Sequence, residues 1–281
     1  MTGVPAIASA PSLPSTPSPA GPGLRDAIGS LPYRLQLAGG WIDQPFVSSL
    51  NPEPPGSMVV VSLQPTVRYM DRCGMATGTR AAARALWGDA LPADRSAASL
   101  VRELYAAENA GLDDPSGSQD MCGLIYPGIS RLDYDASVDG GWFPCHVEST
   151  TEPAVAAWLE RVIHLVPVAP RPPGYGPLGV KRLDPAWIAR LGASGRACYD
   201  AIVATDLAAL GESLNECSKA WNAILPQVFV HPTITIDLLG LLSAYTADYA
   251  GAMYSGCGGG YIVVASEEAP PGSSRVTVRI S

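Results

Sequence analysis

Apolar and polar residues alternate, or apolar residues cluster in short runs, at several places along the chain. The stretch 33–38 alternates, whereas 58–63 is an almost continuous apolar run, Met-Val-Val-Val-Ser-Leu. Alternation is typical of a half-buried strand, and a short apolar run bounded by turn residues is typical of a fully buried one. The pattern predicts strands at 33–38, 58–63, 67–70, 129–134, 261–265 and 276–280.

Elsewhere apolar positions recur every three or four residues, which predicts amphipathic helices. Thr205 is placed to cap a long amphipathic helix that Pro226 ends. The helices predicted are 81–87, 97–109, 118–124, 184–192, 194–204, the segment between Thr205 and Pro226, and 233–249. Because helices and strands mix without strict βαβ alternation, we expect an α+β fold.

Two segments rich in proline interrupt this pattern. Residues 1–30 contain six prolines and no basic residue before Arg25, which predicts a disordered tail rather than a secretory signal. Residues 166–179 contain five prolines and three glycines, which predicts a surface connection. Six cysteines without a CxxC pair then favour free thiols in a reducing cytoplasm over disulfides or a zinc site.

The composition excludes several classes of protein. Of the 281 residues, 47% are apolar and 16% are charged, which is too apolar for a chain that is disordered throughout. The net charge of −8 argues against a nucleic-acid partner, because nucleic-acid binding needs a basic surface. No run of about 18 apolar residues is present, so we expect no membrane span.

Three glycine-containing segments are candidates for ligand contact, because a backbone without side chains lets a ligand approach closely. In the first, a predicted strand that starts near Arg34 ends at Gly39 and Gly40, and Asp43 follows. A carboxylate there can accept hydrogen bonds from hydroxyl groups or hold a cation. An ordinary tight turn with a solvated aspartate is the alternative.

The second segment precedes a predicted helix, where free backbone N–H groups and the helix dipole favour phosphate. It is not a Walker A motif, and a small-residue turn with an ordinary helix cap is the alternative. The candidate phosphate-binding residues are Gly74, Met75, Ala76, Thr77, Gly78 and Thr79.

The third segment, 251–260, has five glycines in ten residues, and a helix–strand linker is the alternative to a ligand contact. Two acidic residues, Glu108 and Asp120, lie between the second and third segments. They can hold Mg²⁺ and serve as a base. For Glu108, a solvated position on a helix is the alternative.

Taken in order, these segments resemble the motifs of the GHMP small-molecule kinases, which include galactokinase, homoserine kinase, mevalonate kinase and phosphomevalonate kinase. Residues 34–43 read Arg-Leu-Gln-Leu-Ala-Gly-Gly-Trp-Ile-Asp and look most like the sugar and heptose-phosphate branch. Residues 251–260 are similar to the family's glycine-rich third motif. Residues 74–79 correspond to its phosphate loop, with Ala76 and Gly78 where the family has Gly and Ser. The resemblance covers 31–281.

The resemblance implies a two-lobed fold with the active site in the cleft between the lobes. An S5-like βα lobe would span 31–150, with the phosphate loop and the catalytic segment. A ferredoxin-like α+β lobe would span 151–281, with the glycine-rich motif. ATP and Mg²⁺ are the implied cofactors. The implied roles are catalysis by Asp120 and Arg34, metal binding by Glu108 and Thr77, and substrate binding by Gly39, Gly40, Asp43, Gly256, Gly258 and Gly259.

The implied activity is transfer of the γ-phosphate of ATP to a hydroxyl of a sugar or sugar-like metabolite in the cytoplasm. Such a protein would have no nucleic-acid or membrane partner, with a homodimer as an assembly still to be tested. One alternative is a non-catalytic ligand-binding or regulatory module on the same fold with a degraded nucleotide pocket. Another is a different ATP-dependent reaction, as in the decarboxylase members. The sequence departs from the family at Met121, where the sugar branch has Gln.

Overall fold

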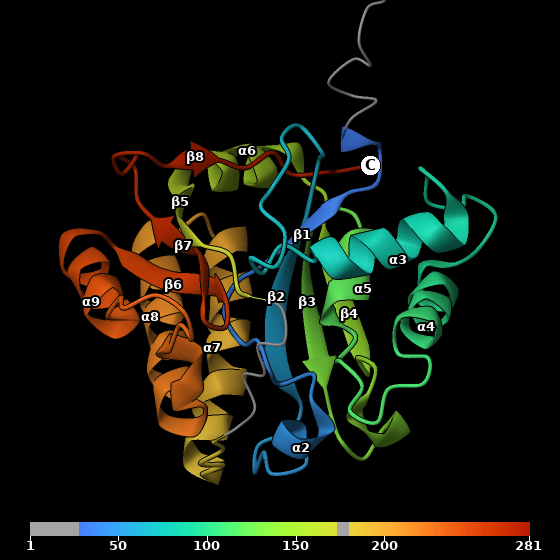
Figure 1. Ribbon diagram of the computed structural model, residues 1–281, viewed down its shortest axis with the longest axis horizontal. Helices are drawn as coiled ribbons and strands as arrows, with labels where there is room; N and C mark the ends of the chain where they lie inside the picture. The colour runs from blue at the N-terminus through green and yellow to red at the C-terminus, as the bar shows by residue number, and fades with distance from the viewer. Residues whose placement is uncertain (1–27, 173–179) are drawn as a thin grey trace, which may run out of the picture.

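The computed structural model describes residues 28–172 and 180–281. The predicted tail over 1–27 and the stretch 173–179 of the predicted surface connection lie outside the described residues. Ile28, which we assigned to the tail, is buried. In the described part of the chain, two four-stranded antiparallel sheets are flanked by helices, which confirms the α+β fold class (Figure 1).

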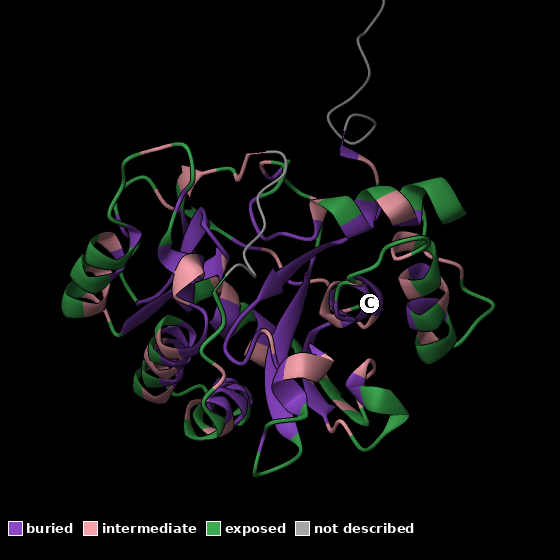
Figure 2. Ribbon diagram, turned by 60° about the horizontal axis from the view of Figure 1, so that its bottom comes forward, coloured by how far each residue is buried: buried purple, intermediate pink, exposed green. Residues whose placement is uncertain are grey.

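The first sheet carries the order β1-β2-β3-β4, and each neighbouring pair is antiparallel. Its second strand, β2, is buried at every position. Helix α5 packs against β1 and β2, and helix α7 packs against β2 and β3 on the other side of the sheet (Figure 1). The central strands between the helices are buried (Figure 2). The strands are β1 (Tyr33–Gln36), β2 (Gly56–Leu63), β3 (Ile129–Tyr134) and β4 (His146–Thr150).

The second sheet carries the order β6-β7-β5-β8 and is also antiparallel throughout. The glycine-rich segment 251–260 is part of a β-hairpin in this sheet, so the linker interpretation was wrong. Both hairpin strands are buried beneath α8 and α9 except at Gly256. The strands are β5 (Ile163–Ala169), β6 (Gly251–Gly256), β7 (Gly259–Ala265) and β8 (Ser274–Arg275).

The helices connect and cover the two sheets. The α-helices are α2 (Pro45–Ser48), α3 (Thr77–Trp87), α4 (Ala97–Glu108), α5 (Gln119–Ile125), α6 (Pro153–Val162), α7 (Pro185–Val203), α8 (Leu207–Ile224) and α9 (Leu238–Asp248). Short 3₁₀ turns cover Asp139–Gly141 and Pro226–Phe229. None of the helices in the described ranges combines the length and the apolar character needed to cross a membrane.

Helix α7 approaches β2 so closely that no side chain fits between them. A Cβ added at Gly195 would lie 1.9 Å from the carbonyl oxygen of Ser57. The two helices predicted at 184–192 and 194–204 form this single helix, and its Gly192 and Gly195 lie against β2. Helix α8 packs against both α7 and β6, so the α7–α8 pair contacts both sheets.

Several predicted boundaries and elements were wrong. Asp206, and not Thr205, caps α8 by accepting a hydrogen bond from the N–H of Ala209 at 3.0 Å. The helix predicted from 233 begins only at Leu238. Residues 67–70 are irregular. The elements missed include β4, which is mostly exposed and polar, helix α6, and β5, which contains residues 166–169 of the predicted surface connection.

The C-terminal segment 276–280, which we predicted to be a strand, forms no regular strand and returns to the first sheet. A single bridge pairs Leu63 with Val278. The N–H of Arg279 donates to the carbonyl of Ser62 at 2.8 Å, and its guanidinium donates to the carbonyl of Ile125, also at 2.8 Å. The end of the chain is therefore tied to β2 and to the end of α5.

Candidate active site

A cavity of about 300 Å³ lies between the first turn of α3 and the hairpin of β6 and β7. Residues from both sheets reach it, although the chain segments that carry them are far apart in sequence. Nine of the residues predicted for the site line it: Arg34, Gly74, Ala76, Thr77, Gly78, Thr79, Glu108, Asp120 and Gly256. The structure therefore brings together the predicted catalytic, phosphate-binding and metal-binding groups.

Arg34 and Asp120 form an ion pair in this cavity. Arg34 is 4% exposed on β1, and its Nη1 also donates to the carbonyl of Gly74 at 3.2 Å. Burial lowers the pKa of Arg34 to about 10, an effect that the nearby carboxylate of Asp43 opposes, so the guanidinium stays charged at neutral pH. Arg34 thus joins Asp120, at the start of α5, to the loop that precedes α3.

Thr79, in the first turn of α3, lies between the two predicted acidic residues. Its hydroxyl donates to Oε1 of Glu108 at 3.0 Å and lies 3.4 Å from Oδ2 of Asp120. Thr77, which we predicted as the metal ligand, accepts a hydrogen bond from the N–H of Arg72 at 3.2 Å instead. The structure therefore places Thr79, rather than Thr77, beside Glu108.

Glu108 is the last residue of α4 and is half-buried. Burial raises its pKa, while the hydrogen bond from Thr79 and the charge of Arg34 oppose that rise. Its Oε2 atom is buried and has no hydrogen-bond partner among the described residues. A buried oxygen without a partner fits a cation ligand, because an unsatisfied carboxylate oxygen is otherwise costly.

The oxygen donors of Thr79, Glu108 and Asp120 fit Mg²⁺, which prefers hard oxygen ligands. Among the described residues, no group of three or more His, Cys, Asp or Glu side chains could hold a metal ion by itself. Magnesium commonly binds one or two carboxylates together with substrate phosphates. These residues therefore suit an ion that a polyphosphate ligand helps to coordinate.

The predicted phosphate loop leaves its backbone accessible at the start of α3. Ala76 adopts the left-handed conformation before the helix, and as an alanine it has no polar side-chain atom to cap the first turn. No atom lies within 4 Å of a Cβ added at Gly78, so the first turn faces open space there. Met75, also predicted for phosphate binding, is instead fully buried in the core.

Gly74 brings this loop against the hairpin of the second sheet. Its φ is +78°, and an added Cβ would lie 2.3 Å from the carbonyl oxygen of Ser255. A residue with a side chain would therefore separate the loop from β6. Of the hairpin glycines predicted to bind substrate, Gly256 lines the cavity. Gly258 donates its N–H to the carbonyl of Val228 at 2.7 Å and belongs to the turn, whereas Gly259 begins β7, and neither lines the cavity.

Asp43, Gly39 and Gly40 were predicted to bind substrate, but none of them lines the cavity. Asp43 is fully buried, and its two carboxylate oxygens lie 3.4 Å from the backbone N and from the Nε2 of Gln119. Burial raises the pKa of Asp43 to about 6, which hydrogen bonding from Gln119 opposes. Gly40 accepts a hydrogen bond from the indole of Trp221 at 2.9 Å. Asp43 therefore contacts the cavity only through Gln119, which lines it.

Several residues that line the cavity were not among those predicted for the site, namely Gln36, Trp41, Arg72, Gln119, Arg171, Ser255 and Cys257. Gln36 and Trp41 flank the first glycine pair, and Gln119 precedes Asp120, so their positions beside predicted site residues were a usable signal. Arg171 had no such signal, because it lies in the proline-rich connection and 99 residues from its contact Arg72.

No protein-family model and no curated protein sequence matches the chain. Solved structures do match its fold. A D-glycero-D-manno-heptose 1-phosphate kinase from Bacteroides thetaiotaomicron is 11% identical with a TM-score of 0.53, over 89% of this chain and 96% of that one. A putative sugar kinase from Campylobacter jejuni is 11% identical with a TM-score of 0.54, over 90% and 95%.

A galactokinase from Lactococcus lactis, solved in complex with galactose, is 12% identical with a TM-score of 0.52, over 85% of each chain. The three structures match nearly the whole described chain, although few residues are shared. The expectation drawn from the motifs is thereby confirmed at the level of architecture. This chain has the two-lobed α+β fold of the GHMP kinases.

Proposed function

We propose that the protein is a kinase that transfers the γ-phosphate of ATP to a hydroxyl group of a sugar or sugar-like molecule, with Mg²⁺. One observation carries the proposal. The Arg34–Asp120 ion pair lies beside the Thr79–Glu108 pair, at the first turn of a helix and in a single cavity. The shared fold with solved sugar kinases supports it.

In this mechanism the first turn of α3 binds the donor's phosphates. Its backbone N–H groups and the positive end of the helix dipole attract anions, and the absence of a side chain at Gly78 leaves them accessible. Glu108 and Thr79 would hold Mg²⁺, which would offset the negative charge of the phosphates during transfer. The buried Oε2 of Glu108 would then have a partner.

Asp120 is the group placed to accept the proton of the attacking hydroxyl. Arg34 holds that carboxylate in position and supplies a positive charge next to the reacting atoms. The hydroxyl oxygen forms the new bond to the γ-phosphorus while the bond to the β-phosphate oxygen breaks, and ADP leaves. The proton rests on Asp120 until solvent takes it.

The proposal is tested by measuring ADP release from ATP·Mg²⁺ with a panel of sugars and sugar derivatives. We expect turnover with at least one acceptor. Asp120→Asn should reduce it by about a hundredfold or more, the usual contribution of a general base, while nucleotide binding persists. Asp114→Asn, at an exposed loop position, is the matched control and should retain turnover. Full activity of Asp120→Asn would contradict the assigned role.

A non-catalytic binding module is separated from a kinase by the same samples. A ligand that binds only the folded protein must raise its melting temperature. A shift with sugars but with no nucleotide, together with no ADP release, would favour the module.

We place the protein in the cytoplasm, which its six free cysteines, five of them buried, support.

A further inference from the structure

Two arginines that this mechanism does not use line the same cavity. The backbone N and the Nε of Arg171 both donate to the carbonyl of Arg72 at 3.1 Å, and the Nε of Arg72 donates to the carbonyl of Arg171 at 3.2 Å. These reciprocal bonds join the loop before α3 to the segment that follows β5. The two side chains are thereby held next to each other before any ligand arrives.

Neither guanidinium has a carboxylate within ion-pair distance among the described residues. The adjoining stretch 173–179, Pro-Gly-Tyr-Gly-Pro-Leu-Gly, contains no acidic residue. Arg34, by contrast, is neutralised by Asp120. Arg171 lines the same cavity as Arg34 and Asp120. The cavity thus holds two uncompensated positive charges in a chain whose net charge is −8.

We propose that Arg72 and Arg171 bind a phosphate monoester carried by the acceptor, so that the substrate is a sugar phosphate or similar phosphorylated hydroxyl compound. The proposal rests on the proposed function and names its substrate class. Arginine is suited to this task, because its planar fork donates two hydrogen bonds to phosphate oxygens. A phosphate monoester carries about −1.5 to −2 charges at neutral pH, which matches two arginines.

The geometry favours the acceptor over the donor as the source of this phosphate. The first turn of α3, with Glu108 and Thr79, already provides for the donor's phosphates. The backbone N–H of Arg72 donates to Thr77, whereas its guanidinium donates to the carbonyl of Arg171, in the segment that follows β5. A sugar phosphate held there can present a hydroxyl to Asp120 within the same cavity of about 300 Å³.

The test is isothermal titration calorimetry on the full chain saturated with ADP·Mg²⁺, which fills the donor site. Glucose 6-phosphate is compared with glucose, and mannose 1-phosphate with mannose. Arg72→Gln and Arg171→Gln are compared with Arg102→Gln, an exposed arginine outside the cavity that pairs with Asp139. We expect a sugar phosphate to bind more tightly than its neutral sugar. Each cavity variant should weaken that binding by about ten- to a hundredfold, as loss of a charge-assisted hydrogen bond implies.

Arg102→Gln should bind as the wild type does, and ADP·Mg²⁺ affinity should stay the same in all three variants. Equal affinity for sugars and their phosphates would overturn the proposal. An equal loss of ADP·Mg²⁺ and sugar-phosphate binding in the cavity variants would also overturn it, because the arginines would then serve the donor. If the protein binds no nucleotide, the kinase function fails, and the same titrations without ADP still decide the anion site.

Discussion

The hydroxyl of Thr79 donates a hydrogen bond to Glu108 over 3.0 Å, and so connects the first turn of α3 with the last residue of α4. Thr79→Val keeps the shape of the side chain but removes this donor and the oxygen that would contact Mg²⁺. We expect a lower maximal rate and a higher Mg²⁺ concentration for half-maximal activity. Both are measured by titrating Mg²⁺ in the ADP-release assay.

Thr77→Val is the matched comparison, because Thr77 lies in the same turn but contacts Arg72 instead. We expect its Mg²⁺ requirement to resemble that of the wild type. A shift in the Mg²⁺ dependence of Thr77→Val, with none in Thr79→Val, would restore the assignment made from the motif alone.

The buried carboxyl of Asp43 should make stability depend on pH. Burial raises its pKa to about 6 in the folded protein, from 3.8, so the folded state binds its proton more tightly than the unfolded state does. The resulting stabilisation is present below about pH 4 and is lost as the pH rises through about 6, with a total near 3 kcal/mol. Urea unfolding from pH 4 to 7 measures it.

Asp43→Asn cannot titrate at this position and keeps nearly the same volume. Relative to Asp43→Asn, the wild type should therefore have its highest free energy of unfolding at low pH. This advantage should shrink as the pH rises from 4 to about 6, because only the wild type loses a proton at this position. A difference that does not vary with pH would show that Asp43 keeps an ordinary pKa in the folded protein.

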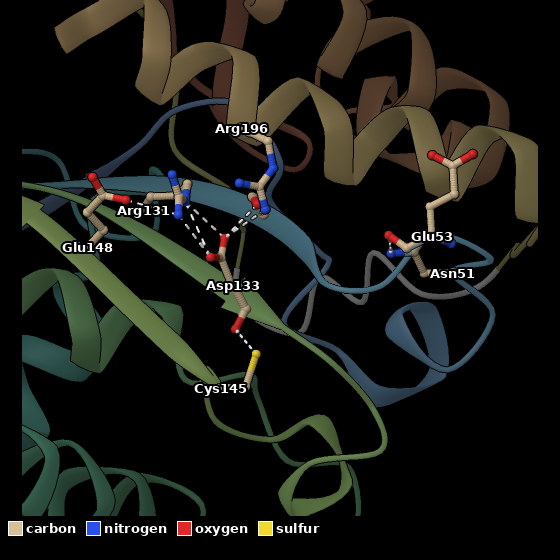
Figure 3. Close-up of polar contacts among 8 residues, drawn as sticks. Asn51, Glu53, Arg131, Asp133, Cys145, Glu148 and Arg196 are labelled. Carbon is tan, nitrogen blue, oxygen red and sulfur yellow. Dashed lines mark hydrogen bonds and ion pairs between the residues drawn. The ribbon is translucent and has the colours of Figure 1, made fainter.

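Asp133 is the centre of a polar network between the first sheet and α7 (Figure 3). Asp133 is 3% exposed and accepts a hydrogen bond from the hydroxyl of Ser57 at 2.6 Å. It also forms ion pairs with Arg131 at 3.1 Å and with Arg196 of α7 at 3.9 Å. Asp133→Ala leaves Arg131 and Ser57 without this partner. We expect a loss of roughly 3–5 kcal/mol in the free energy of unfolding, measured with urea.

Glu148→Gln is the control for that measurement. Glu148 also pairs with Arg131, at 3.0 Å, but its side chain is 48% exposed. An exposed pair contributes at most about 1 kcal/mol, so this variant should remain nearly as stable as the wild type. Similar losses in the two variants would show that burial of Asp133 adds nothing to its ion pairs.

Two glycines near the start of α3 should respond to alanine in opposite ways. Gly78→Ala meets no atom within 4 Å, so the helix should gain up to about 1 kcal/mol from propensity, while the new methyl group reduces ATP affinity. Gly74→Ala should destabilise the protein by more than about 1 kcal/mol, because its φ is +78° and its Cβ would collide with Ser255. Thermal unfolding and ATP titration of both variants test this pair.

Much of the fold was predictable where the signal is local. The core strands around 58–63 and 129–134 and the helix at 97–109 were predicted correctly, because a strand or helix imposes its own period on neighbouring residues. The exposed edge strand β4 was missed, since it buries too little to show an apolar pattern. Residues 276–280 look like a strand but extend a sheet formed far earlier in the chain, which no local pattern reveals.

The sequence by itself determined the order of the motifs and, with it, the expectation that Arg34, Gly74, Glu108 and Asp120 meet. The tertiary structure alone decided which neighbour within each motif faces the cavity. The turn of α3 presents Thr79 to Glu108. The packing of α5 buries Asp43, and the loop after β5 brings Arg171 to Arg72. These outcomes depend on contacts between distant segments, whereas a motif records only residues that are close along the chain.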